Sequence, residues 1–79
     1  MVKLINITRK NNYIFCDIFI EDCVIPISAI YNIVDNRFEQ CDLPDEYGWC
    51  TNHINHAKEF LKTMTDINEL PTEKTIYWC

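Results

Sequence analysis

The segment from Tyr13 to Ile20 constrains the fold of this chain more than any other stretch. Its even positions are all apolar, and only Asp17 interrupts the apolar run at its odd positions. Side chains of a β-strand point alternately to the two faces of a sheet, so a strand of this kind is covered on both faces. We therefore expect a helix over one face of this strand and, over the face of Phe15 and Phe19, a second subunit.

Turn signals divide the first half of the chain into four predicted strands. Asn and Asp favour tight turns because they tolerate positive φ. Such dipeptides lie at residues 11–12, 21–22 and 35–36. The predicted strands are residues 2–8, 13–20, 23–34 and 37–41, a β-meander joined mainly by two-residue turns. Pro26 lies inside the third of them and cannot donate a ladder hydrogen bond, so that strand is expected at an edge or with a bulge.

A single amphipathic helix is predicted over about residues 50–64. Its apolar residues fall within roughly 120° of a helical wheel, and its lysines lie outside that stripe. Thr51 or Asn52 is expected as the N-cap. A loop is predicted over 68–72 and a last strand over 75–78. The order ββββαβ indicates an α+β domain, with one helix packed on an antiparallel sheet of four to five strands.

Size and composition restrict the chain to one small domain over residues 1–79. A hydrophobic content of 48% excludes a disordered tail, and a single Gly excludes a Gly-rich phosphate loop. No run approaches the ~18 apolar residues of a membrane span. The five cysteines are an odd number, and the first ten residues lack the apolar core of a secretion signal. We therefore expect a cytoplasmic protein with reduced thiols.

The charge is unevenly distributed along the chain. Residues 1–16 carry three basic and no acidic side chains, whereas residues 17–46 carry eight acidic side chains and one basic one. The whole chain has a formal charge of −5. Direct binding of nucleic acid needs a basic surface, so this distribution argues against it. An acidic surface would instead be attracted to a basic groove on another protein, or would simply keep a small protein soluble.

Two cysteines and two histidines, Cys41, Cys50, His53 and His56, match the ligand types of a tetrahedral zinc site. Metal ligands must converge on one point, however, and Cys50, His53 and His56, at positions i, i+3 and i+6, would point in different directions around a helix. The usual zinc motif of two cysteines separated by two to four residues is also absent. We therefore predict no metal and no cofactor, with a zinc-stabilised domain kept as an alternative. In the preferred interpretation His53 packs against the sheet with one ring nitrogen hydrogen-bonded, and His56 is exposed.

Cys50 and His53 could also meet across one helical turn as a nucleophile and its base. A cysteine near a helix N-terminus has a lowered pKa and is more reactive. A thiol hydrolase needs in addition an oxyanion hole, an orienting third group and a cleft. A domain of this size offers little concavity, so we predict that the protein is not an enzyme.

An acidic segment rich in aromatic residues is the strongest candidate for function. Carboxylates that steer a basic partner and aromatic rings that anchor it are typical of interaction surfaces. The predicted partner-binding residues are Glu39, Asp42, Asp45, Glu46, Tyr47 and Trp49. In the competing interpretation the segment is a solvated loop whose Tyr47 and Trp49 pack into the core.

In size, charge and composition, though in no motif, the chain resembles small acidic accessory proteins of phages and mobile elements, anti-CRISPR inhibitors among them. This resemblance implies a non-enzymatic protein that inhibits a host nucleic-acid-acting protein by presenting carboxylates where DNA would bind. A small structural or regulatory homodimer, joined through Phe15 and Phe19, is the alternative function.

Overall fold

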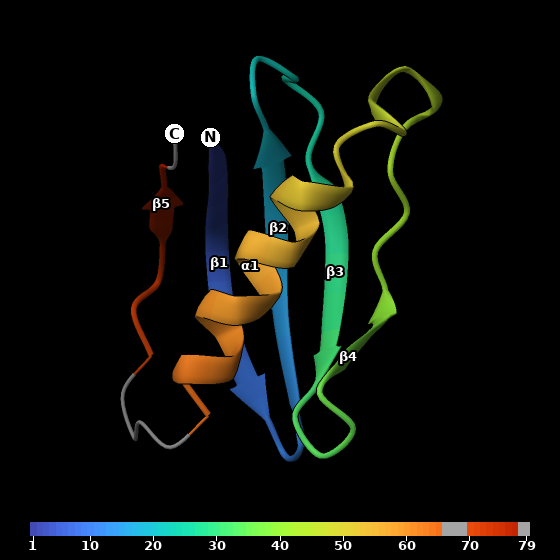
Figure 1. Ribbon diagram of the computed structural model, residues 1–79. Helices are drawn as coiled ribbons and strands as arrows, with labels where there is room; N and C mark the ends of the chain where they lie inside the picture. The colour runs from blue at the N-terminus through green and yellow to red at the C-terminus, as the bar shows by residue number, and fades with distance from the viewer. Residues whose placement is uncertain (66–69, 78–79) are drawn as a thin grey trace.

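The computed structural model describes residues 1–65 and 70–77. Five strands form one antiparallel sheet in the order β4-β3-β2-β1-β5, and one helix crosses a single face of it (Figure 1). The elements are β1 (Val2–Lys10), β2 (Tyr13–Ile20), β3 (Ile27–Asn32), β4 (Arg37–Gln40), the 3-10 helix η1 (Asp45–Tyr47), α1 (Thr51–Thr63) and β5 (Lys74–Ile76). This arrangement confirms the predicted α+β fold with one helix on a β-meander.

The core lies between α1 and the sheet, and strand β2 runs through its middle. The even positions of β2 are buried, with Ile14 and Ile18 at 0% exposure. Helix α1 contributes Ala57 and Leu61, which are fully buried as well. Alternation along the strand and helical spacing along α1 thus put two apolar surfaces in contact. The odd positions of β2 face away from the helix, and Phe15 there is 36% exposed.

Strand β1 is longer than predicted because a bulge keeps its apolar side chains on the helix side. The register with β2 shifts between Ile5 and Thr8, and Asn6 adopts a positive φ of 53°. One extra residue at this point allows Leu4 and Ile7 to face the core, although they are three positions apart. The strand then continues to Lys10, paired with Tyr13.

The predicted third strand, residues 23–34, is wrong at both ends. Strand β3 begins only at Ile27, directly after Pro26, which has no N–H to give to a ladder. The expected two-residue turn at 21–22 is therefore a longer connection over residues 21–26. Because Pro26 lies outside the strand, β3 also needs no edge position and lies between β2 and β4. The fourth strand ends at Gln40, one residue earlier than predicted.

The predicted helix is confirmed, but its predicted N-cap is wrong. Thr51 and Asn52 lie inside α1, and Cys50 occupies the cap position without a side-chain hydrogen bond to the helix. The Cys50 side chain is fully buried, so it packs in the core instead of capping.

Of the predicted loop at 68–72 and strand at 75–78, residues 68–69 and Trp78 lie outside the described residues. Within them, the last strand begins one residue earlier than predicted and ends before Tyr77: β5 pairs with β1 from Lys74 to Ile76. No helix in the described part of the chain is long and apolar enough to cross a membrane.

Candidate functional site

Two connecting segments meet at one end of the sheet, and we call them together the acidic end. They are residues 21–26, between β2 and β3, and residues 42–50, which lead through η1 into α1 (top of Figure 1). The Tyr47 hydroxyl donates a hydrogen bond of 3.1 Å to Asp22 Oδ1, which ties the segments to each other. A second link joins the Glu21 carboxylate to the ring of His53 in the first turns of α1.

The acidic end is strongly negative in composition. It holds five carboxylates and neither Lys nor Arg: Glu21, Asp22, Asp42, Asp45 and Glu46. Of these, Asp42, Asp45 and Glu46 are exposed residues that were predicted to bind a partner. Glu21 differs because its carboxylate also accepts a hydrogen bond of 2.8 Å from the amino group of Met1. The bonds to that ammonium group and to His53 hold the pKa of Glu21 below its ordinary value.

The two aromatic residues of the acidic end have different surroundings. Tyr47 is half-buried against the core, and its hydrogen bond to Asp22 raises its pKa to about 12. Trp49 is 68% exposed, and its indole N–H donates to the carbonyl oxygen of Glu46 at 3.2 Å. The indole lies edge-on to the His53 ring at a centroid distance of 5.7 Å, which holds the exposed ring in place. Only Tyr47, therefore, packs in the way that the competing interpretation proposed for both residues.

Two further apolar residues at this end were missed by the sequence reasoning. Val24 is 85% exposed and Ile25 is 68% exposed, on the connection between β2 and β3. Both were assigned to a strand, in which alternation would have buried one of them. Pro26 was the available signal, because a strand that starts after it leaves Val24 and Ile25 in a connection. The acidic end thus displays three large apolar side chains among its carboxylates.

Glu39, also predicted to bind a partner, lies away from the acidic end. Its carboxylate accepts hydrogen bonds from Asn32 Nδ2 at 2.9 Å and from Arg37 Nε at 3.3 Å. The bond from Asn32 is the main reason that the pKa of Glu39 is lowered. Asn32 pairs with Tyr13, at the start of β2, whereas the acidic end follows Ile20 at its finish. Glu39 is therefore part of the opposite half of the sheet.

The Cys and His residues that resembled a zinc set are all buried or half-buried. His53 is 6% exposed and has a ring nitrogen bonded to Glu21, which confirms its predicted packing, whereas His56 is half-buried and not exposed. Burial raises the pKa of Cys50, and it raises the pKa of Cys41 to about 11. A thiolate is the form that binds metal or attacks a substrate, so burial disfavours both roles. Among the described residues, no three His, Cys, Asp or Glu side chains are grouped to hold a metal ion.

Comparison with protein-family models gave no match, and neither curated proteins nor solved structures gave a significant match. The function must therefore be argued from the surface of the molecule.

Proposed function

We propose that this protein is a non-enzymatic interaction protein that binds a basic surface of another protein through its acidic end. The observation that carries the proposal is the exposure of Val24, Ile25 and Trp49, at 85%, 68% and 68%, among carboxylates and without any Lys or Arg in the two segments. Isolated exposed apolar residues are common, but several gathered at one end with a polar surround are typical of an interaction site.

The parts of this surface have separate physical roles. Trp is the residue most enriched at the energetic centre of protein interfaces, and the contacts of Trp49 with His53 and Glu46 reduce the entropy it would lose on binding. Exposed carboxylates at Asp42, Asp45 and Glu46 would speed the encounter with a basic partner and disfavour acidic ones. The apolar residues would thus supply most of the affinity, and the carboxylates would determine which partner is bound.

The partner we propose is a host protein that acts on nucleic acid, and the protein would inhibit it. Proteins that bind nucleic acid present Lys and Arg to the phosphates, so they offer the basic surface that this end requires. An acidic protein seated there would exclude the nucleic acid, as expected for an inhibitor of phage or mobile-element type. We place the protein in the cytoplasm, a proposal supported by the free thiols of Cys16, Cys23, Cys41 and Cys50.

The test is capture of proteins from a bacterial lysate, followed by competition with duplex DNA. We expect the immobilised protein to retain nucleic-acid-acting proteins, to release them as salt rises, and to lose them to added DNA. The double variant Asp42→Lys with Glu46→Lys should reduce the retained amount at least tenfold and flatten the salt dependence.

The matched control is Glu59→Lys with Glu73→Lys, which makes the same change in net charge at exposed positions outside the acidic end. It should retain the partner at close to the wild-type level. Unchanged capture by the first double variant, or equal loss with both, would refute a role for the acidic end.

A further inference from the structure

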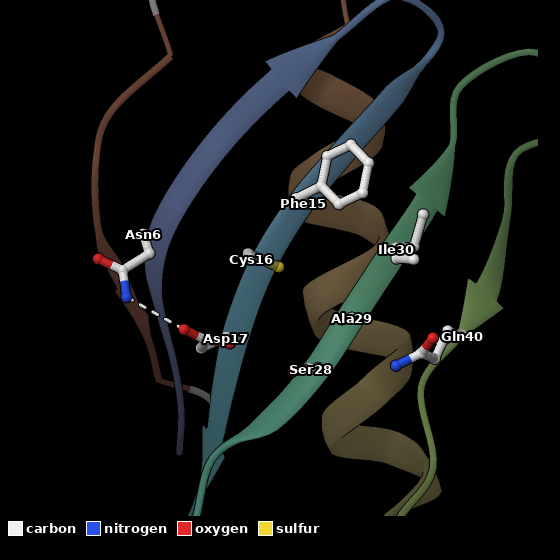
Figure 2. A pocket seen from close by; sticks show the side chains of 8 residues that line it. All are labelled: Asn6, Phe15, Cys16, Asp17, Ser28, Ala29, Ile30 and Gln40. Carbon is white, nitrogen blue, oxygen red and sulfur yellow. Dashed lines mark hydrogen bonds between the residues drawn. The ribbon is translucent and has the colours of Figure 1, made fainter.

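The face of the sheet opposite α1 is apolar, although no described element of the chain covers it. We call it the open face; Figure 2 looks onto it, with the helix behind the sheet. Its apolar side chains are Ile5, Tyr13, Phe15, Phe19 and Ile30, all half-buried or exposed. Tyr13 and Phe15 keep 39% and 36% of their surface in solvent. A strand with apolar residues on both faces is typical of a sheet that is covered on both sides.

Several polar groups of the open face, Asp17 and Glu39 among them, are already paired within the chain. Asn6 Nδ2 donates to Asp17 Oδ2 at 3.0 Å, the bond drawn in Figure 2. Glu39 accepts hydrogen bonds from Asn32 and Arg37. Burial of a polar group costs much less free energy when its hydrogen bonds are already made. These paired groups can therefore be removed from water at a lower cost than their charges suggest.

The charges of the open face suit a second copy of the same chain. Of the charged residues that strand pairing or hydrogen bonds place there, Lys3, Lys10 and Arg37 are basic and Asp17 and Glu39 are acidic, on a protein whose formal charge is −5. Contacts between two acidic ends would be repulsive. The open face carries both signs, so two copies can meet there without that penalty.

The strand register gives the symmetry of such a contact. Asp17 follows Phe15 by two residues, Tyr13 precedes it by two, and Lys10 is the β1 partner of Tyr13. We consider a two-fold axis that lies between two stacked sheets, perpendicular to the strands and at the level of Phe15. This axis places the two Phe15 rings against each other. It also places Asp17 of each copy opposite Tyr13 and its β1 neighbour Lys10 in the other copy. A hollow of about 370 Å³ beside Phe15 and Ile30 is available for the second copy's Phe15 ring.

The available area is of the right order. The chain measures 34 × 21 × 21 Å, so the plan area of one long side is somewhat below the ~800 Å² that each partner contributes to a standard interface, and above the roughly 500 Å² per partner at the lower limit for a specific one. We infer that a second copy of this chain packs face to face on the open face, around Phe15. This interface goes beyond the proposed function because it leaves the acidic end free. The axis across the strands places the two acidic ends at opposite ends of the dimer, where each can bind a partner.

The test is the mass of the purified full chain, measured by sedimentation equilibrium at several concentrations up to about 100 μM, a hundredfold above a Kd of about 1 μM. We expect the mass of two chains, each of 9.4 kDa. Phe15→Glu should weaken the dimer at least tenfold, because it buries a carboxylate at the centre of the contact. Val34→Glu is the matched control, since Val34 is 70% exposed in the β3–β4 turn, and it should remain a dimer.

Lys10→Glu is a second variant, at an exposed site that takes no part in the core. It places an acid opposite Asp17 of the other copy and should also shift the wild-type equilibrium toward the monomer, which decides the question if Phe15→Glu fails to fold. A single-chain mass for the wild type across the whole concentration range would overturn the inference. So would a dimer that persists in folded Phe15→Glu, or one that Lys10→Glu leaves unchanged. Loss of the dimer with capture at the acidic end intact would separate this interface from the proposed function.

Discussion

Ile18 and Ile25 are the same residue type seven positions apart, and they represent the two regions that matter most in this molecule. Ile18 is fully buried between the sheet and α1, whereas Ile25 is 68% exposed at the acidic end. The difference follows from the backbone, because Ile18 occupies a strand position facing the helix and Ile25 lies in a connection before Pro26. Burial of the first stabilises the fold, while exposure of the second leaves apolar surface available to a partner.

The largest effect on stability is expected from a substitution of Ile18. Ile18→Ala should lower the free energy of unfolding by about 2–5 kcal/mol, because it removes buried methyl groups and leaves a cavity that the sheet and α1 cannot close. Urea denaturation followed by circular dichroism measures this loss. A loss below about 1 kcal/mol would mean that the face under the helix is loosely packed.

The carboxylate of Glu21 links the acidic end to His53 of α1, and low pH should weaken this link. The pKa of Glu21 is lowered by its bonds to the Met1 ammonium group and to His53. A group whose pKa is lower in the folded state stabilises the fold above its unfolded pKa of about 4.3, and this contribution is lost as pH falls below that value.

We therefore expect the wild type to melt at a higher temperature than Glu21→Gln at neutral pH, with a difference that shrinks below about pH 4.3. Thermal melts at a series of pH values would show this convergence. The exposed helix residue Glu59, changed to Gln, provides the control, and its difference from the wild type should not converge in the same way. A constant difference between wild type and Glu21→Gln would argue against the link.

Alkaline pH should act on the bond that joins the two segments of the acidic end. The hydrogen bond to Asp22 raises the pKa of Tyr47 to about 12. A group whose pKa is raised in the folded state stabilises the fold below its unfolded pKa of about 10, and this contribution disappears as pH rises toward 12. Tyr47→Phe should therefore lose less stability than the wild type over this range. The tyrosinate absorbance gives an independent measurement, and Tyr13→Phe serves as the control.

The smallest effect on stability is expected from a substitution of Ile25, in contrast to Ile18. Ile25→Ala should change the free energy of unfolding by no more than about 0.5 kcal/mol, because its side chain has little contact to lose. The same variant should weaken partner capture about tenfold if the acidic end is the binding surface. A variant that is destabilised but binds normally would reverse both assignments.

The fold was predictable from the sequence to the extent that it follows from local periodicity. Strand β2 begins and ends as predicted, at Tyr13 and Ile20, because its apolar residues continue between two turn signals. The stripe of α1 likewise gave the helix to within one residue at each end. Both are patterns within one element, and they depend on backbone geometry alone.

Features that depend on contacts between distant segments could not be predicted in this way. The partner of His53 is Glu21, 32 positions earlier, and the β-turn signal at Glu21 gave no indication of that role. Glu39 lies apart from the other predicted acids, where its carboxylate accepts a hydrogen bond from Asn32 on the neighbouring strand β3. Tyr47 bonds to Asp22, 25 positions earlier, whereas Trp49 bonds to nearby Glu46, and no local pattern contains this difference. The sequence thus indicated the acidic, aromatic segment over residues 42–49, but not that residues 21–26 lie beside it or that Glu39 lies apart from it.

The short edge strands of the sheet have a consequence for how the protein behaves when it is concentrated. The edges are formed by β4, of four residues and with an irregular register against β3, and by β5, of three residues. An exposed sheet edge is a template for strands of other chains, and long flat edges lead to open-ended aggregation. A foreign strand could form only a few ladder hydrogen bonds with either of these short strands. Growth by strand addition onto β4 or β5 is therefore disfavoured, whereas the proposed contact between open faces would stop at two copies.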